Sequence, residues 1–391
     1  MGKVPRAWNF NIDFIGHMNT ILWVSAVLCA LSIASLAVRG LNLGTDFAGG
    51  YELQVQFPRT VSETEIRGLL APMELEDARV QRFGDEAENA YLIMVRGNSH
   101  ALGDGDRRRL RGEMEKLAGG PAGLTQWSLA ESGESFVVGF NTPVTEAQVR
   151  AVATAKKLVV KSLSHNERAE QPEFKVELES LADGIAQALQ TGLKLPAGHE
   201  LIKRVDFVGP QVGSQLRNEG IMAVVYSLLL IFIYVALRFD FYFSPGAILA
   251  TLHDVILTMG FFSVFQIEFN LTVVAAILTL IGFSLNDTVV VFDRIRENVS
   301  RYRARELHAL VNASINETLS RTILTSGTVL LVTLALLLFG GPFIFGLSIC
   351  MFVGVVVGTY SSIAVASPLY ILLREYDQRR EAKQQGRAVS A

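Results

Sequence analysis

One aspartate, Asp287, interrupts an apolar stretch of residues 271–292, LTVVAAILTLIGFSLNDTVVVF, that is long enough to cross a bilayer. A carboxylate near the centre of a membrane-spanning helix costs about 2.5–3.5 kcal/mol on insertion scales. Such groups occur where they carry ions or protons, or where they hold a helix bundle together. The stretch therefore predicts a membrane protein whose function centres on Asp287.

Composition supports this interpretation. Half of the 391 residues are hydrophobic, and the formal net charge of −3 argues against nucleic-acid binding, which favours a concentrated basic face. The two cysteines, Cys29 and Cys350, lie in apolar stretches and lack the spacing of a disulfide framework or a metal site. We therefore expect neither a metal nor nucleic acid.

Six apolar stretches are long enough to be membrane spans, and Asp254 and Asp287 are their only formally charged residues. The predicted spans are residues 20–38, 221–237, 244–267, 271–292, 322–339 and 343–373. The last contains Pro368, so we expect it to bend or end near there. Residues 39–220, between the first two spans, are numerous enough for a separate domain.

Basic residues predict the orientation of these spans. They precede the first span, follow the second, fill the connection between the fourth and fifth, and recur in the tail. The short connections on the other side carry neither lysine nor arginine. We expect a cytoplasmic-membrane protein with residues 1–19 and 374–391 in the cytoplasm and the 39–220 domain outside.

The first span has an alternative interpretation as a cleaved leader, because Ser35, Leu36 and Ala37 loosely resemble a signal-peptidase site. The apolar run is longer than in most leaders, and its charged start lies far upstream. We therefore treat this span as a retained anchor.

The 39–220 domain reads as α+β. Residues 51–57 alternate like a strand, and residues 62–73 read as a helix that opens with Ser62 and a capping-box Glu65. A comparable order of strands and helices recurs after the glycine-rich joint 119–123. The pattern predicts one or two βαββαβ-like units that contain no catalytic motif, and hence a folding or binding module rather than an enzyme.

Asp287 has a potential partner in the fifth span. It follows Asn286 near the inner end of the fourth span, and Arg321 begins the fifth at the same depth. Because the two spans are antiparallel, Asp287 and Arg321 are placed to form an ion pair. The pair is either a static lock on the bundle or a proton site that opens and closes.

A second acid, Asp254, lies midway along the third span beside His253. Adjacent residues on a helix point to different faces, so we expect no direct His253–Asp254 relay. Asp254 either belongs to a proton path or, as the favoured alternative, makes interhelical hydrogen bonds.

Two further stretches have predicted structural roles. Gly354 and Gly358, in the last span, form a G-x-x-x-G pattern typical of close helix packing. The arginine-rich stretch 292–321 reads as an amphipathic inner helix, and it predicts contact with lipid headgroups or a partner.

Several motifs together resemble the SecD/SecF family of protein-export membrane subunits. The stretch 41–50, LNLGTDFAGG, is similar to the family's G-x-D-F-x-G-G signature, whose residues here are Gly44, Asp46, Phe47, Gly49 and Gly50. VGPQVG at 208–213, the run 281–298 and the run 314–328 resemble further family segments in the same order. The resemblance covers the first span, its exit and residues 208–373.

This resemblance implies an accessory subunit of preprotein export, with six transmembrane helices arranged like half of an RND-type bundle. It implies SecD, the SecYEG channel and YajC as partners, and the proton gradient as the energy source without a cofactor. The family pattern places Asp287 and Arg321 in the proton route; we add Asn286 and Asp254 as candidates. Family members commonly have a shorter outer region, so residues 120–196 are a candidate extra segment.

Two other classes fit less well. A small-molecule RND exporter needs two six-helix halves, and only one is present. An intramembrane aspartyl protease places G-x-G-D around one acid, whereas Gly282 here lies five residues before Asp287.

Overall fold

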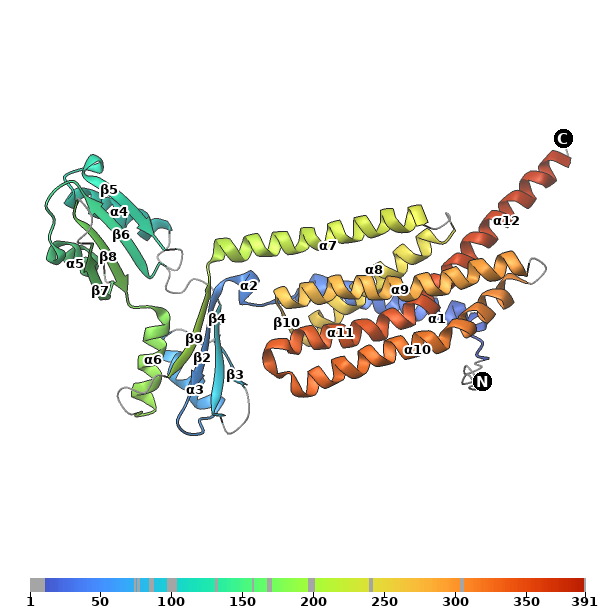
Figure 1. The fold of residues 1–391 in the computed structure, drawn as a ribbon, viewed down its shortest axis with the longest axis horizontal. Helices are drawn as coiled ribbons and strands as arrows, with labels where there is room; N and C mark the ends of the chain where they lie inside the picture. The colour runs from blue at the N-terminus through green and yellow to red at the C-terminus, as the bar shows by residue number, and fades with distance from the viewer. Residues whose placement is uncertain are drawn as a thin grey trace, which may run out of the picture. The chain divides into compact units, whose positions relative to one another are not determined.

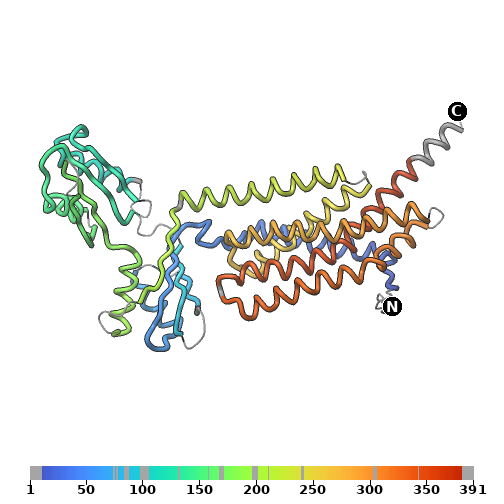
Figure 2. Tube along the Cα trace, in the orientation of Figure 1, coloured from blue at the N-terminus to red at the C-terminus, as the bar shows by residue number. Residues whose placement is uncertain are grey.

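The computed structural model describes residues 11–73, 75, 78–83, 88–96, 104–130, 133–156, 158–166, 171–195, 201–238, 242–302 and 306–389 (Figures 1 and 2). The basic residues before the first span lie outside this set. The chain divides into a membrane unit, Met1–Gly44 with Asn218–Ala391, and an outer unit, Thr45–Arg217.

The membrane unit is helical. Six helical segments in the described part of the chain are long and apolar enough to cross a bilayer, which confirms the predicted multi-pass architecture. They are built from α1 (Met18–Arg39), α7 (Pro210–Arg238), α8 (Ser244–Phe265), α9 (Leu271–Arg301), α10 (Leu307–Phe339), and α11 (Gly341–Ser361) with α12 (Ser367–Val389).

Helix α9 is central to the bundle. It contacts α8, α10 and α11, which run beside it in Figure 1, whereas α1 packs along α8. Gly260 on α8 allows α1 to pack this closely, because a Cβ at position 260 would lie 2.2 Å from the Cβ of Ser32 on α1. One cluster of buried apolar side chains, which includes Phe292 and Tyr370, draws residues from α7, α8, α9, α10 and α12.

The predicted separate inner helix is absent from the described residues of 292–321. Instead α9 continues to Arg301 and α10 already begins at Leu307, so the stretch lengthens both spanning helices. Its buried positions, such as Ile295 and Ile315, continue the apolar stripes of the two spans, and its charged positions pair on the surface, as Arg294 does with Glu317. Helical periodicity is therefore unbroken across the membrane boundary.

The last span departs from regular α-helical geometry just before Pro368. Residues Ser362–Ala366 form a π-helical turn between α11 and α12, and the Ser367 hydroxyl donates to the Ser362 carbonyl at 3.0 Å. Proline has no N–H to donate one turn back, so a local rearrangement of this kind is expected. The helix continues after the turn, so the span does not end there.

The outer unit contains two four-stranded antiparallel sheets. The first has the order β3-β4-β2-β9, from β3 (Arg79–Phe83), β4 (Ala90–Arg96), β2 (Gly50–Gln56) and β9 (Ile202–Val208). Helices α3 (Glu63–Leu70) and α6 (Leu181–Gly192) pack on it through buried residues such as Ile66 and Ile185. This unit has the predicted βαββαβ order, with an insertion before α6.

The inserted part forms the second sheet. Its order is β5-β6-β8-β7, from β5 (Leu124–Leu129), β6 (Ser135–Phe140), β8 (Glu173–Leu178) and β7 (Val160–His165). Helices α4 (Asp104–Leu117) and α5 (Glu146–Ala155) cover it. The β6-α5-β7-β8 path repeats β2-α3-β3-β4, but the remaining helix and strand precede it instead of following. The second sheet is thus a circular permutation of the first.

The insertion differs in extent from the candidate segment 120–196. It begins at Asp104, before the glycine-rich joint, and ends with β8 at Leu178. Helix α6 lies within residues 120–196 but packs on the first sheet, since Leu181, Ile185 and Leu189 are buried in the core of that sheet. A helix joins the sheet that can cover its apolar face, and that pairing is not visible in chain order.

Candidate functional site

Asp287 lies inside the bundle, where a hydroxyl group from the neighbouring helix α10 reaches it. Its side chain on α9 is 3% exposed, and its Oδ2 accepts a hydrogen bond of 3.2 Å from Ser326 on α10. The Ser326 hydroxyl in turn lies 2.7 Å from Thr359 Oγ1 on α11. Three helices therefore contribute to one polar cluster, Asp287–Ser326–Thr359.

The predicted Asp287–Arg321 ion pair is not formed, since no described basic group lies within ion-pair distance of the Asp287 carboxylate. The Arg321 side chain is exposed on α10 yet near enough to act on Asp287 electrostatically. Asn286 is also exposed, because it lies on a different side of α9 from the buried Asp287.

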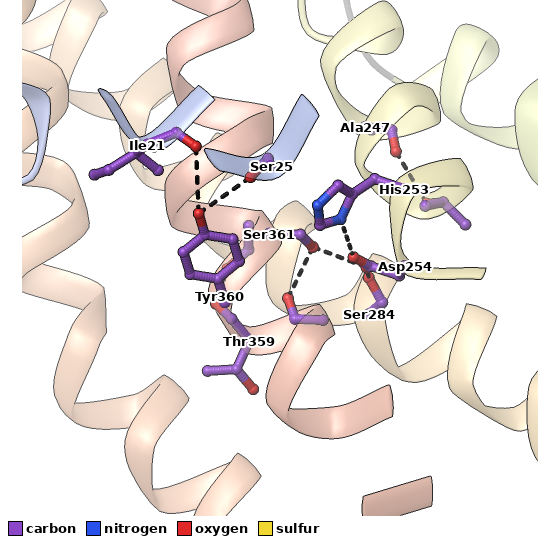
Figure 3. Close-up of polar contacts among 12 residues, drawn as sticks. Ile21, Ser25, Ala247, His253, Asp254, Ser284, Thr359, Tyr360 and Ser361 are labelled. Atoms are coloured by element: carbon purple, nitrogen blue, oxygen red, sulfur yellow. Dashed lines mark hydrogen bonds and ion pairs between the residues drawn. The ribbon is translucent and has the colours of Figure 1, made fainter. Parts of the chain in front are cut away.

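Asp254, 1% exposed on α8, is the centre of a second polar cluster (Figure 3). Its Oδ2 accepts hydrogen bonds from the hydroxyls of Ser361 on α11, at 2.8 Å, and Ser284 on α9. These are the interhelical hydrogen bonds that the sequence favoured. Ser284 lies one helical turn before Asp287, so the two clusters share helices α9 and α11.

The expectation for His253 was wrong. Its Nδ1 lies 2.9 Å from Asp254 Oδ1, so the adjacent side chains do meet. The ring is 6% exposed and curls back along α8 toward the acid, as Figure 3 shows. The Cα–Cβ bonds of neighbouring helix residues differ in direction by about 100°. The two side chains can still turn toward each other, and an apolar interior favours such a contact between polar groups.

Small residues bring these helices together. A Cβ on Gly354 would lie 2.4 Å from Leu280 Cδ2, and one on Gly358 would lie 3.0 Å from Ser284 Cβ. Both glycines of the predicted packing pattern thus face α9. The contact at Gly358 is what lets Ser284 approach Asp254.

Other polar groups extend the interior network. The Tyr360 hydroxyl lies 3.1 Å from Ser25 Oγ on α1 and is also directed at the Ile21 carbonyl (Figure 3). Several buried polar atoms have no hydrogen-bond partner among the described residues: His253 Nε2 and the hydroxyls of Thr258, Thr288 and Thr322. The sequence did not identify Ser326 as the partner of Asp287, nor Thr359 as the partner of Ser326.

The G-x-D-F-x-G-G stretch forms tight backbone contacts. Gly44 donates its N–H to the Phe269 carbonyl at 2.9 Å, where β1 (Asn42–Leu43) pairs with β10 (Glu268–Phe269). Asp46 and Phe47 lie in the short helix α2 (Thr45–Ala48), and Phe47 is buried. Gly49 and Gly50 have φ values of 74° and 138°, and a Cβ on Gly50 would lie 2.1 Å from the Val95 carbonyl oxygen. The backbone conformation of the motif therefore requires glycine at position 50.

One face of the bundle carries small and polar side chains that are exposed. On α9 they recur every three or four residues, and Arg321 and Thr328 are exposed on α10. The α9 set is Thr272, Ala275, Thr279, Gly282 and Asn286. Hydrocarbon favours neither an arginine nor an amide, so this face suits a protein neighbour better than lipid.

The site does not resemble a metal centre or a protease dyad. Among the described residues, no group of three or more His, Cys, Asp or Glu side chains could hold a metal ion. Asp254 and Asp287 bind separate hydroxyl groups and no described contact joins them, whereas an aspartyl protease brings two carboxyls together.

Comparisons with known proteins agree with the motifs. Residues 190–376 match the family described as protein export membrane protein SecD/SecF, C-terminal, and residues 34–60 match the SecD/SecF GG motif. The protein translocase subunit SecF of Koribacter versatilis is 35% identical, over 95% of this chain and 94% of the relative. That of Rickettsia prowazekii is 31% identical over 98% and 97%.

A solved structure shares the fold. SecDF of Thermus thermophilus, described as a translocon-associated membrane protein, is 29% identical, with a TM-score of 0.59 over 96% of this chain. The present chain spans 40% of the length of that protein. The K. versatilis alignment covers nearly all of both chains, so that relative has an outer region of similar extent.

Proposed function

The chain belongs to the SecD/SecF family of protein-export membrane proteins, and we propose that it promotes preprotein translocation as an accessory subunit of the Sec machinery. It would work with SecD, draw on the proton gradient without a cofactor, and associate with the SecYEG channel and YajC. The names of its relatives, translocase subunits, support the export role. The translocon-associated SecDF supports the SecD and channel contacts; YajC rests on the family resemblance alone.

Asp287 carries the energetic part of this proposal. It is a buried carboxylate in an apolar span, held by the Ser326 hydroxyl rather than by a cation. A hydroxyl can donate to the ionised acid or accept from the protonated acid, so the cluster accommodates both forms. Arg321, near but not bound, would engage the ionised form and release the protonated one.

The available energy is sufficient for a modest conformational bias. Moving one charge through the membrane potential provides about 2.3 kcal/mol per 100 mV. A bias of that size changes the ratio of two conformations by a factor of about fifty, since 1.4 kcal/mol corresponds to tenfold. One proton per cycle at Asp287 could therefore drive the outer unit between two arrangements.

Asp254 and the exposed face complete the proposed route. Asp254 shares α9 and α11 with the Asp287 cluster through Ser284 and Ser361, so we assign it a supporting role. Asn286 and Arg321 lie on the exposed polar face, which we propose is covered by SecD. An acid from SecD would then reach the same arginine, as the family pattern implies.

The positive-inside pattern supports the orientation. The basic connection between α9 and α10 and the basic tail would lie in the cytoplasm, and the outer unit would lie outside, where emerging preproteins pass. Because all six helices would lie in the membrane, lipid is the last of the proposed partners.

Replacing Asp287 tests the proposal in cells. Asp287→Asn keeps the size and the hydrogen bond to Ser326 but removes the titrating group. We expect normal insertion and SecD co-purification, with accumulation of unexported precursor comparable to that of a deletion strain. Precursor and mature forms are measured by pulse labelling.

Asp293→Asn is the matched control, because Asp293 lies on the same helix with a largely exposed side chain near Arg238. It should export normally. Normal export by Asp287→Asn would refute the proton role, and degradation of the variant would favour a purely structural carboxylate. Arg321→Lys, which keeps the charge, should retain part of the activity.

A further inference from the structure

The outer unit contains a cavity that neither the proton route nor the family motif uses. It has a volume of about 610 Å³ and lies where β7 begins and β8 leads into α6. This volume falls within the range of ligand clefts in proteins. Its apolar wall includes Met73, Leu158, Val159, Leu178 and Leu181.

Hydrogen bonds connect the two sheets around this cavity. Tyr51, on β2 of the first sheet, donates to Glu134 beside β6 of the second at 2.7 Å. Lys161 on β7 pairs with Asp183 on α6 at 2.7 Å. The cavity is therefore a built feature of the outer unit and not a gap between unconnected parts.

An unpaired strand edge begins beside the cavity. In the described residues, β7 is the last strand of its sheet, with β8 on one side only. Val159, immediately before β7, lines the cavity and is 61% exposed. A strand edge offers main-chain donors and acceptors to an extended peptide, and an adjacent pocket can take one of its side chains.

The rim of the cavity carries a negative charge. Glu179, between β8 and α6, lines it with an exposed carboxylate that binds no described side chain. Its backbone is fixed, since its N–H donates to the Val159 carbonyl at 2.8 Å. The exposed carboxylate complements a positive charge close to the apolar side chain in the cavity.

We propose that this cavity and the β7 edge bind an extended, apolar polypeptide segment with a lysine or arginine next to its anchoring side chain. The segment adds a strand beside β7, places an apolar side chain against Val159 and Leu178, and directs the basic residue to Glu179. This inference rests on the proposed export function, in which unfolded preprotein passes the outer unit, and it names the contact surface.

The test uses the purified full chain in lipid nanodiscs and a fluorescent ten-residue peptide of alternating leucine and serine with one central lysine. Anisotropy measures the dissociation constant. Val159→Lys should weaken binding about tenfold, equivalent to about 1.4 kcal/mol. Gln126→Lys, the same charge on the exposed opposite edge strand β5, is the matched control and should leave binding within about twofold.

Two further arms define the mode of binding. Glu179→Lys should reverse the charge preference, so that a peptide with glutamate in place of lysine binds better than the original. A peptide N-methylated at alternate residues should bind at least about tenfold more weakly, because it cannot pair with β7.

Equal binding of the N-methylated peptide, or displacement by decanoate as effective as by the peptide, would show an unspecific aliphatic pocket and overturn the proposal. So would equal effects of Val159→Lys and Gln126→Lys. These outcomes leave the export function standing, since the Asp287→Asn export assay tests that function independently.

Discussion

At the scale of single residues, backbone conformation explains why glycine occurs in the G-x-D-F-x-G-G stretch, as Gly50 shows. Gly50 combines a positive φ of 138° with a backbone neighbour, the Val95 carbonyl, that cannot move without breaking the β2–β4 ladder. Only glycine adopts this geometry without strain. The G-x-D-F-x-G-G stretch therefore secures the exit of the first span into the outer sheet.

Gly50→Ala should prevent stable folding of the first sheet, because its methyl group would overlap the Val95 carbonyl. Limited proteolysis of the full chain should show rapid cleavage in the outer unit and an intact membrane unit. Gly68→Ala is the control: Gly68 is exposed within α3 with open space around it, and alanine should stabilise that helix by about 1 kcal/mol. Equal resistance of both variants would contradict this role for Gly50.

Site residues could be predicted from the sequence where their position in an apolar span is sufficient to identify them. Their hydrogen-bond partners could not be predicted, because these depend on how the helices are rotated. The sequence identified Asp287 and Asp254, because any charge in an apolar span is conspicuous. It could not identify Ser326 as the partner of Asp287, or Thr359 as the partner of Ser326, since helix rotation depends on packing across three helices. For the same reason the Asp287–Arg321 pair was predicted from depth, which the sequence shows, without the rotation that separates the two side chains.

At the scale of elements, caps and periodicity determine where a helix forms, whereas tertiary packing determines which sheet it joins. Ser62 caps α3 as predicted by accepting from the Glu65 N–H at 3.1 Å, although the Glu65 side chain turns to Arg59. Helix α6 begins with a complete capping box, in which Ser180 and Asp183 bind each other's backbone N–H. Helix α6 lies within residues 120–196 and yet packs on the first sheet, a choice that chain order alone does not decide because both sheets present an apolar face.

Asp183 makes the stability of α6 dependent on pH. Burial raises the pKa of its carboxyl, but hydrogen bonds from Lys161 and Ser180 outweigh burial, so that pKa lies below its usual value of 3.8. A depressed pKa in the folded state stabilises the protein above the unfolded pKa, and this contribution is lost as the pH falls through the folded value.

Asp183→Ala should therefore reduce the opening free energy of α6 by about 1 kcal/mol at pH 7, the usual cost of a lost cap. The difference between the variant and the parent should shrink below pH 3.8. Hydrogen exchange of the Leu181–Gly192 amides measures both. A difference that stays constant at every pH below 3.8 would show that the carboxylate is not responsible.

At the scale of the whole molecule, we propose that a neighbouring protein covers part of the bundle. The exposed polar face on α9 and α10 is costly toward lipid, and the proposed proton residues Asn286 and Arg321 belong to it. The sequence predicted the six spans and the outer α+β domain, because span length and strand alternation are local signals. It left open the permuted second sheet, whose order is set by tertiary pairing.

Gly282→Leu tests whether SecD covers this face. A side chain at Gly282 meets nothing within 4 Å in this chain, so the variant should fold and insert normally. If a SecD helix packs there, co-purification of SecD should fall several-fold. Leu331→Trp, at a 68% exposed apolar position of α10, is the control and should retain SecD. Undiminished SecD with Gly282→Leu would place the partner elsewhere.

The central claim is that protonation of Asp287 couples the gradient to export, and gradient-dependent release of preprotein from membrane vesicles tests it most directly. Vesicles containing the parent protein and SecD should release a stalled preprotein several-fold faster when a proton gradient is imposed. Vesicles with Asp287→Asn should release it at the slow rate in both conditions, whereas Asp293→Asn should respond like the parent. A full gradient response in the Asp287→Asn vesicles would contradict the account.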